Sequence, residues 1–323
     1  MSARIKQIEY YLPEKIIRNE DLAKEFPEWE ANKIEEKVGI QSRHVASKEE
    51  TAVDLAYNAA EKLLSKIDRT TIDFLILCTQ SPDYFLPTSA CILQDRLKLS
   101  KKIGAFDFNL GCSGYIYGLG IVKGLINSNI AKKVLFITSE TYSKHIHQSD
   151  KVSRSIFGDG ATATLIEYSE ETGIHEFVFG TDGSGMNNLI VKRGGMRHNK
   201  SEDFDNPNNS LYMNGPEIFN FTLDVIPELV KDTIALNNIK IEDINYFIFH
   251  QANKFMLDYL RKKLKIDPVY FYNNILSTGN TVSSTIPIAL KDCLDNNLVR
   301  KNDKILIAGF GVGYSWGATI ITV

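Results

Sequence analysis

The chain has 323 residues, of which 43% are hydrophobic, with 37 Lys and Arg against 40 Asp and Glu and a formal net charge of −3 at pH 7. This composition is typical of a globular protein, and the charge balance argues against a nucleic-acid partner or an anionic membrane surface. The sequence has neither an apolar run of the roughly 18 residues that a membrane span needs nor a signal-peptide-like start, so we expect a cytoplasmic protein.

Helical and strand patterns alternate along the chain. In chain order, the sequence predicts a helix over 51–64 that Thr51 caps, strands at 74–77 and 134–137, a helix over 218–229, and strands at 247–249 and 305–308. The strand segments are apolar on both faces. Such strands alternating with amphipathic helices indicate an α/β fold in which helices cover both faces of the sheets.

Four segments of the first half recur in the same order in the second. Each match is weak, since apolar strands resemble one another, but their common order predicts a duplicated architecture. We therefore predict two similar α/β halves, 1–170 and 171–323, that share one core. Asn, Asp, Gly and Pro cluster within 194–210 and predict a surface excursion there. The matching segments are 72–78 with 244–250, 111–113 with 279–281, 134–137 with 305–308, and 160–162 with 317–319.

Four cysteines are spaced as neither a disulfide framework nor a zinc site. Cys78, Cys91 and Cys293 are interpreted as small buried hydrophobic residues. Cys112 follows a predicted strand and precedes a helix, in the glycine-flanked turn 111–114. A helix N-terminus favours a thiolate, and the glycines permit a strained backbone and leave room for a substrate. Local context leaves Cys112 open as a nucleophile or as a core residue.

Two further polar residues occupy positions where sites form. His250 ends a buried strand, at the rim where sites of α/β proteins lie, although a structural rim histidine is the more common occupant of such a position. Asn280 opens a helix, where it could simply be the N-cap. The duplication makes Asn280 the equivalent of Cys112, with His250 near the same pseudo-twofold axis. The sequence therefore predicts that these three side chains converge.

Two other patterns suggest cofactors only at first sight. Residues 309–317 mimic a dinucleotide-binding loop, but that motif needs a following helix, and 318–323 is predicted to be a final strand. His145 and His147 could face one side of a strand, yet no nearby carboxylate or cysteine completes a metal site. We expect neither a nucleotide nor a metal.

The order of six motifs resembles that of β-ketoacyl-acyl-carrier-protein synthase III. The resemblance covers the chain from Tyr11 to Gly317 and implies a thiolase-like fold, with two α/β halves in a five-layered αβαβα arrangement, and a homodimer. The first half would carry the nucleophilic Cys, and the second the His and Asn. The motifs are Gly111-Cys112-Ser113-Gly114, Phe157-Gly158-Asp159-Gly160-Ala161, Tyr212-Met213-Asn214-Gly215, His250-Gln251-Ala252-Asn253, Gly279-Asn280-Thr281 and Gly309-Phe310-Gly311.

The resemblance also implies roles for these residues. Cys112 would be acylated by an acyl-CoA, and His250 and Asn280 would hydrogen-bond the thioester oxygen of a malonyl group on acyl carrier protein. Phe310, Gly311 and Val312 would form the oxyanion and malonyl pocket, with Phe310 as its apolar wall. Coenzyme A or phosphopantetheine thioesters are the substrates, and no cofactor or metal is implied.

Several recognition positions depart from the family's pattern. Lys151 stands where the family has an Arg beside the adenine of coenzyme A, and Trp29 is displaced in sequence from the position of the partner Trp. Lys262 and Lys263 remain as a carrier-protein patch, but Asn220 and Phe255 replace basic residues there. Leu86 replaces a Phe that floors the acyl pocket, which predicts room for a longer or branched acyl group.

The leading hypothesis is a decarboxylative Claisen condensation that gives a 3-oxoacyl product, in fatty-acid initiation or in a specialised acyl or polyketide pathway. A second hypothesis is an acyltransferase of the same fold that passes the acyl group to an alcohol or amine without releasing CO2. A third is a non-catalytic subunit of a dimer, which the presence of Cys112, His250 and Asn280 together disfavours.

Overall fold

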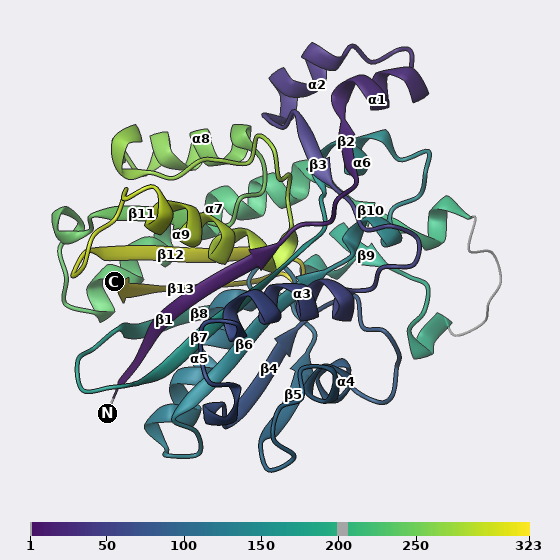
Figure 1. Cartoon of the computed structure of the whole chain (residues 1–323). Coiled ribbons are helices and arrows are strands. Elements are labelled where there is room, and N and C mark those ends of the chain that lie inside the picture. The colour runs from purple at the N-terminus through teal and green to yellow at the C-terminus, as the bar shows by residue number, and fades with distance from the viewer. Residues whose placement is uncertain (1, 199–205) are drawn as a thin grey trace.

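Two β-sheets and three layers of helices make up most of the protein (Figure 1). The computed structural model describes residues 2–198 and 206–323. The amino-terminal half of the chain supplies the first sheet, and the carboxy-terminal half supplies the second sheet. Within the described residues, none of the helices combines the length and the apolar character needed to cross a membrane.

The first sheet has five strands in the order β1-β7-β6-β4-β5. β4 is parallel to both β5 and β6, whereas β7 is antiparallel to β6 and β1. The strands are β1 (Ser2–Tyr11), β4 (Phe74–Cys78), β5 (Gly104–Phe108), β6 (Lys133–Glu140) and β7 (Gly160–Ser169).

The second sheet repeats this topology with four strands in the order β11-β12-β13-β8. β11 is parallel to β12, and the pairs β12–β13 and β13–β8 are antiparallel, as in the series β4-β6-β7-β1. A single parallel bridge between Phe247 and Phe271 stands where β5 pairs with β4. The strands that the repeated segments predicted occupy corresponding positions in the two sheets. The strands are β8 (Ile174–Thr181), β11 (Tyr246–Phe249), β12 (Lys304–Gly311) and β13 (Ser315–Thr322).

Six helices form the layers around these sheets. α3 and α4 cover the outer face of the first sheet, α7 and α8 cover the outer face of the second, and α5 and α9 lie between the sheets and contact both. The prediction of a five-layered αβαβα, thiolase-like fold is therefore confirmed. The helices are α3 (Ala52–Leu64), α4 (Ser89–Arg96), α5 (Gly114–Asn127), α7 (Gly215–Leu236), α8 (Lys254–Lys263) and α9 (Thr285–Asp295).

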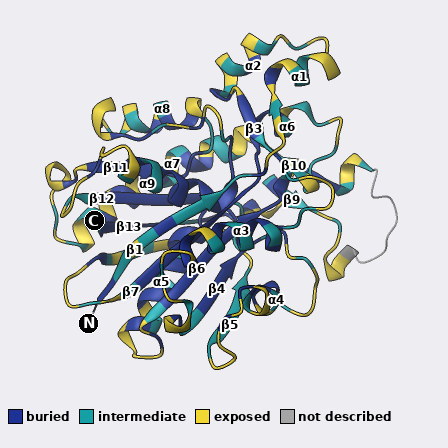
Figure 2. Cartoon of the chain, viewed as in Figure 1, coloured by how far each residue is buried: buried dark blue, intermediate teal, exposed yellow. Residues whose placement is uncertain are grey.

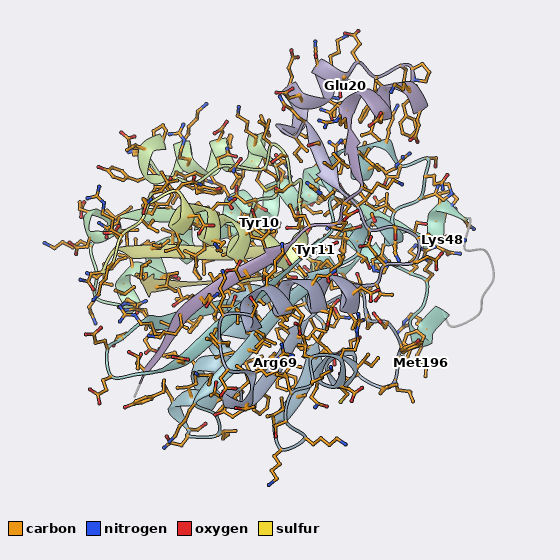
Figure 3. The ribbon with its side chains drawn as sticks, viewed as in Figure 1. Tyr10, Tyr11, Glu20, Lys48, Arg69 and Met196 are labelled. Atoms are coloured by element: carbon orange, nitrogen blue, oxygen red, sulfur yellow. The ribbon has the colours of Figure 1, made fainter. Side chains whose placement is uncertain are left out.

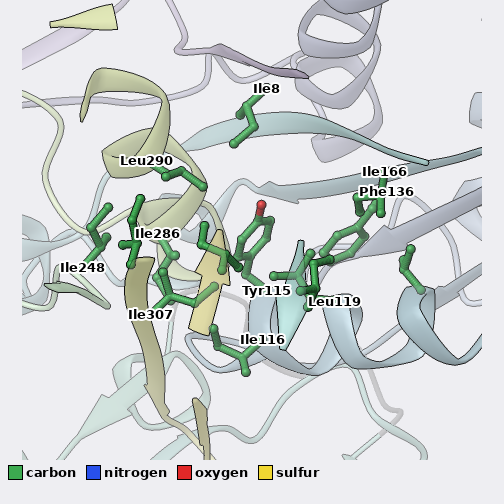
Figure 4. Packing of buried hydrophobic residues seen from close by; sticks show 14 of the residues in the cluster. Ile8, Tyr115, Ile116, Leu119, Phe136, Ile166, Ile248, Ile286, Leu290 and Ile307 are labelled. Atoms are coloured by element: carbon green, nitrogen blue, oxygen red, sulfur yellow. The ribbon is translucent and has the colours of Figure 1, made fainter. Parts of the chain in front are cut away.

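The central layer is the most deeply buried part of the fold. Tyr115 and Ile116 of α5 pack with Ile286 and Leu290 of α9, and residues of both sheets surround them (Figure 4). The sheets and the central helices are mostly buried, while exposed residues concentrate on the outer helices and loops (Figure 2). The first residues of both central helices therefore lie deep inside the molecule, next to the turns that the sequence singled out.

A small lobe projects from one end of the sheets (Figure 1). Glu20 of α1 marks it in Figure 3. It contacts the core through α6 and α8, and a second small hairpin lies near it. The lobe contains β2 (Ile16–Arg18), α1 (Asn19–Glu25), α2 (Ala31–Val38) and β3 (Ser42–His44); α6 is Lys151–Ile156, and the hairpin pairs β9 (Leu189–Val191) with β10 (Leu211–Met213).

Local predictions hold in most places. Thr51 caps α3 by accepting a hydrogen bond from the Asp54 amide, and the stripe over 218–229 lies within the longer helix α7. The cysteine interpretation is wrong at one position, since Cys91 is exposed on α4, whereas Cys78 and Cys293 are buried. The predicted excursion over 194–210 falls partly on residues 199–205, outside the described residues. The division of the halves at 170/171 falls between β7 and β8 and stays a prediction.

Candidate active site

Cys112 lies in the turn between β5 and α5, two residues before the first residue of that helix. It is 6% exposed. It belongs to a small apolar cluster with Tyr142, Phe157 and Val282, which come from three different segments. The thiol is therefore in an enclosed, mainly apolar setting at the buried end of a central helix.

Close packing explains the glycines around Cys112. A Cβ on Gly311 would lie 2.8 Å from Cys112 Cβ and 3.0 Å from its Sγ, and a Cβ on Gly114 would lie 2.4 Å from Cys78 Sγ. Neither Gly111 nor Gly114 has the positive φ that the sequence reasoning allowed for. These glycines are needed because neighbouring atoms approach closely, and the turn itself needs no left-handed backbone there.

His250 follows the last residue of β11 and is almost fully buried. Its amide donates to Ala308 O of β12 at 2.8 Å. Its Nδ1 lies 2.7 Å from Thr285 Oγ1, and its ring meets the Phe310 ring edge-to-face at 5.6 Å. The imidazole is thereby fixed on both sides, with Nε2 left to face the third residue of the predicted set.

Asn280 is that third residue. Its Nδ2 lies 3.5 Å from His250 Nε2 and 3.4 Å from Ala252 O, and its Oδ1 accepts the Val282 amide at 2.9 Å. Its own amide donates to Ile156 O at 2.9 Å. The carboxamide is therefore held with the NH2 group towards His250.

The end of β12 brings the three residues together. Ala308 and Phe310 hold His250, and the next residue, Gly311, contacts Cys112. Phe157, which packs in the cluster of Cys112, forms a parallel bridge with Asn280. Cys112 and the His250–Asn280 pair thus share neighbours at the end of β12 and at Phe157, as the predicted convergence requires.

The remaining residues of the predicted oxyanion and malonyl pocket lie at the same place. Phe310 is buried against His250. Val312 follows β12, and a Cβ on Gly111 would lie 2.6 Å from Val312 Cγ1. Val312 does not have the positive φ that a glycine there would have allowed, so this side chain is compatible with the backbone.

Burial controls the ionisation of the site. It raises the pKa of the Cys112 thiol to about 12, with a smaller contribution from the charge of Glu140. It lowers the pKa of His250 to about 3. The resting site therefore holds a thiol and a neutral imidazole, and the predicted thiolate at the helix N-terminus is not the favoured form.

Glu140, which the sequence reasoning missed, is fully buried at the end of β6. Its two carboxylate oxygens accept the Gln80 amide and the Ser81 hydroxyl, each at 2.9 Å. Burial raises its pKa to about 8. A carboxyl group at the end of a strand with an apolar run was a signal in the sequence, but its partners lie in the loop after β4.

A pocket of about 410 Å³ is lined in part by residues of the cluster that contains Cys112. Tyr142 and Leu189, which both pack in the cluster of Cys112, line it. Phe85 lines it as well, and the next residue, Leu86, is 83% exposed. Leu86, the predicted acyl-pocket residue, thus follows a residue that lines this pocket but does not line it, and its side chain is exposed. The other residues lining it are Gln80, Pro82, Asn109, His145, Ile190, Val191, Arg193, Gly194, Gly195 and Val312.

Trp29 and Lys151 meet on the surface between the lobe and α6. Lys151 Nζ lies 5.1 Å from the centre of the Trp29 ring and 2.6 Å from Glu28 Oε1. A second pocket, of about 310 Å³, is lined by Trp29, Lys33, Ile34 and Val152 among others. The displacement of Trp29 in sequence therefore does not separate it from Lys151 in space.

The predicted carrier patch lies at the carboxyl end of α8. Lys262 and Lys263 are both exposed, and Lys263 Nζ donates to Leu223 O at 2.7 Å. Phe255, 60% exposed at the amino end of the same helix, stacks on Phe219 of α7. A third pocket, of about 500 Å³, lies beside it. The surface at the amino end of α8 is thus partly aromatic.

The two cofactor-like patterns have structural explanations. After the glycines of 309–317 the chain continues as β13, as predicted, and not as a helix. His145 Nε2 lies 3.3 Å from Gln80 O, and His147 Nδ1 lies 2.7 Å from Ser149 Oγ. Across residues 2–198 and 206–323, no group of three or more His, Cys, Asp or Glu side chains is arranged to hold a metal ion.

Comparison with known proteins finds the same family along most of the chain. The family described as 3-oxoacyl-[acyl-carrier-protein (ACP)] synthase III matches residues 106–183, and its C-terminal region matches residues 234–323. A β-ketoacyl-[acyl-carrier-protein] synthase III of Clostridium perfringens is 38% identical over 314 residues, which cover 96% of each chain.

Solved structures agree in fold over the whole length. A 3-oxoacyl-(acyl-carrier-protein) synthase III that is 46% identical superposes with a TM-score of 0.97 and covers 100% of both chains. A 3-oxoacyl-(acyl-carrier protein) synthase from Burkholderia xenovorans LB400, 35% identical, gives a TM-score of 0.94 and covers 100% of this chain and 94% of its own.

Proposed function

The chain belongs to the 3-oxoacyl-[acyl-carrier-protein] synthase III family, and we propose that it joins an acyl group from acyl-CoA to the two-carbon unit of malonyl-acyl-carrier protein. One observation carries this proposal for the site. The thiol of Cys112 is packed against Gly311, and the preceding residue, Phe310, packs against a neutral His250 whose Nε2 lies 3.5 Å from the Asn280 amide. A nucleophile beside two neutral hydrogen-bonding groups suits a reaction that proceeds through an acyl-enzyme and an enolate.

In the first step Cys112 takes the acyl group. Its sulfur attacks the thioester carbonyl of acyl-CoA, the bond from that carbonyl to the coenzyme A sulfur breaks, and the Cys112 proton leaves with the coenzyme A thiol. Because the resting thiol is protonated, this transfer needs no external base for its balance. The backbone N–H groups of Cys112 and Val312 are the proposed donors to the transient oxyanion.

In the second step malonyl thioester loses CO2. The bond between its methylene and its carboxylate breaks, and the electron pair passes to the thioester oxygen as an enolate. His250 and Asn280 donate hydrogen bonds to that oxygen. The buried ring of Phe310 offers no solvation to the carboxylate, which favours its departure as neutral CO2.

In the third step the enolate carbon attacks the acyl carbonyl on Cys112. A carbon–carbon bond forms, the carbon–sulfur bond to Cys112 breaks, and the released thiolate takes up one proton. The product is a 3-oxoacyl thioester on the carrier protein. The groups used are side chains and backbone of this chain, and the proposal requires no metal or prosthetic group.

Mass spectrometry of the intact protein tests this proposal. After incubation with a panel of acyl-CoA thioesters we expect one acyl group on Cys112, and addition of a malonyl thioester should discharge it with release of CO2. Cys112→Ala should not be acylated, and Cys91→Ala, which removes an exposed thiol, should react as the wild type does. Discharge of the acyl group without CO2 would support transfer to an alcohol or amine acceptor instead.

The proposed contacts for coenzyme A lie between the small lobe and α6. The Trp29 ring and Lys151 offer a flat apolar surface beside a positive charge, which suits the adenine and phosphates of coenzyme A. Lys151 is also paired with Glu28 at 2.6 Å. Glu28→Gln should therefore tighten acyl-CoA binding by freeing the lysine, while Lys151→Ala should raise the KM for acyl-CoA and leave acylation at saturation unchanged. Lys262 and Lys263 are the proposed contacts for the acidic carrier protein.

We also propose that the active form is a homodimer. β5 is an edge strand of the first sheet, and Phe85 and Leu86 lie 79% and 83% exposed in the loop after β4. An open edge beside exposed apolar side chains is typical of a subunit interface. Light scattering after size exclusion should find a dimer for the wild type and for the control Val269→Asp, and a monomer for Phe85→Asp. A wild-type monomer would contradict the proposal.

We further propose that the protein acts in the cytoplasm. The four free cysteines of the chain and its soluble thioester substrates fit that reducing compartment.

A further inference from the structure

The position of the proton on His250 decides whether this residue can donate to a substrate oxygen. A neutral imidazole carries one proton, on either Nδ1 or Nε2, and the hydrogen bond made by one nitrogen determines the state of the other. Nε2 is the nitrogen that faces Asn280, and Nδ1 faces Thr285. The proton position therefore depends on whether the Thr285 hydroxyl donates to Nδ1 or accepts a hydrogen bond from it.

Thr285 is buried at the first position of α9 and has two possible acceptors for its single hydroxyl proton. Its Oγ1 lies 2.7 Å from His250 Nδ1 and 3.0 Å from Val282 O. Val282 O already accepts the Thr285 backbone amide. Val282 O can accept the Thr285 hydroxyl as well as the amide, but the 2.7 Å contact with His250 Nδ1 is the shorter of the two. On this ground we assign the hydroxyl proton to the contact with Nδ1.

The distance on the other side of the ring agrees with this assignment. Asn280 Nδ2 is 3.5 Å from His250 Nε2, which is longer than the ordinary range for a hydrogen bond. Rotation of the Asn280 carboxamide by half a turn would break a hydrogen bond, because its Oδ1 accepts the Val282 amide at 2.9 Å. With the proton on Nε2, the two nitrogens, 3.5 Å apart, can both donate to one substrate oxygen.

The short turn before α9 therefore orients both donors. Val282 adopts a left-handed conformation, φ +57°, although it is β-branched and fully buried. Such a residue is strained in this region, so the surrounding structure must hold it there. In this conformation its amide holds Asn280 and its carbonyl lies beside Thr285.

We propose that Thr285 is a positioning residue that keeps the proton of neutral His250 on Nε2, so that His250 and Asn280 donate together to one substrate oxygen. This inference rests on the proposed function for the identity of that oxygen, the thioester oxygen of the malonyl group. The proton position itself is a property of the free protein and can be measured without any substrate.

The test uses protein labelled with ¹⁵N in its histidines, with the His250 signals assigned by their loss in His250→Asn. Long-range proton–nitrogen correlation should find Nε2 protonated in the wild type and in Thr285→Ser. In Thr285→Val, which keeps the shape but removes the hydroxyl, the proton should redistribute towards Nδ1. A wild-type His250 protonated on Nδ1 would overturn the proposal, and so would an unchanged tautomer in Thr285→Val.

Kinetics give a second, independent readout. Thr285→Val should slow CO2 release from the malonyl thioester by about 10- to 100-fold, the loss typical when the outer partner of a metal-binding histidine is removed, with Cys112 acylation close to the wild-type rate. Thr285→Ser should restore decarboxylation. Thr233→Val is the matched control, because Thr233 is equally buried and its hydroxyl donates to Leu229 O at 2.7 Å, on α7.

The possible outcomes separate the two proposals. If the wild type releases no CO2 from any malonyl thioester, the proposed function fails and the spectra still decide the tautomer. If CO2 is released but equal losses of acylation and decarboxylation occur in Thr285→Val, the residue is merely structural and this proposal fails. Should Thr285→Val not fold, the wild-type spectrum and the Thr285→Ser variant still decide the proton position.

Discussion

Replacement of Gly311 by alanine probes the packing on which the nucleophile depends. Gly311 is the last residue of β12 and does not have a positive φ, so alanine fits its backbone. The added Cβ, however, would lie 2.8 Å from Cys112 Cβ and 3.0 Å from Sγ. Because nonbonded carbon atoms are best separated by about 3.5–4.0 Å, either Cys112 or β12 must move by about 0.5–1 Å.

Both stability and chemistry should respond to that movement. Overpacking of a closed site costs about 1–3 kcal/mol of unfolding free energy. A displacement of about 1 Å at a reacting atom can cost about 100-fold in rate, so acylation of Cys112 should fall by up to this factor. The matched control is Gly124→Ala in α5, where nothing lies within 4 Å of the new Cβ. It should gain about 0.5–1 kcal/mol from helix propensity and acylate normally.

Two measurements decide the matter. Intact mass recorded over time after addition of acyl-CoA gives the acylation rate, and urea unfolding gives the free energy of each variant. If Gly311→Ala acylates at the wild-type rate and unfolds at the wild-type urea concentration, Cys112 is not held against β12 as described. A loss of acylation of the same size in Gly124→Ala would point to a general effect of alanine substitution.

Three further predictions concern hydrogen bonding and ionisation in the site. Asn280→Ala should slow CO2 release by about 100- to 1000-fold, the usual loss for one oxyanion donor, and leave Cys112 acylation intact; an equal loss of both steps would contradict the assigned role. Burial raises the pKa of Glu140 from 4.5 to about 8, so the folded chain retains a proton that the unfolded chain releases. Relative to Glu140→Gln, the wild type should therefore lose stability as the pH rises through this interval; identical pH dependence of the urea midpoints would exclude this. Since burial raises the pKa of Cys112 to about 12, its labelling by iodoacetamide should keep increasing with alkaline pH, with exposed Cys91 as the reference in peptide mass spectra. A plateau near neutral pH would reveal a thiolate.

The parts of the fold that the sequence predicted are those with local signals. Apolar runs such as 74–77 and 305–308 are strands because each is buried on both faces, and their common order revealed the repeated topology. Cys112, His250 and Asn280 were found because each follows a strand or precedes a central helix. Because α5 and α9 pack side by side between the two sheets, the strand ends and helix starts that carry these residues lie close together.

The parts that escaped prediction depend on contacts between distant segments. Trp29 meets Lys151 only because the lobe folds back onto α6. Glu140 accepts hydrogen bonds from the loop after β4. Thr285, at the start of α9, contacts His250, which follows β11 and lies 35 residues earlier in the chain. The helix-terminus argument for a Cys112 thiolate failed because desolvation outweighs a partial charge at the helix end once the thiol is buried.

The two halves use equivalent positions for different purposes, which explains why the site belongs to both. By the repeat, Cys112 corresponds to Asn280, and Cys78 at the end of β4 corresponds to His250 at the end of β11. In the first half Gly114 lets α5 approach the Cys78 sulfur, which donates to Leu110 O at 3.2 Å and stays buried. The equivalent of Gly114 in the second half is Val282, whose left-handed conformation orients Asn280 and neighbours Thr285. Both turns thus contribute to the proposed site, through Cys112 and Asn280. Of the two strand-end residues only His250 does so. The first half therefore supplies the nucleophile and the second half supplies both donors, and neither half is sufficient alone.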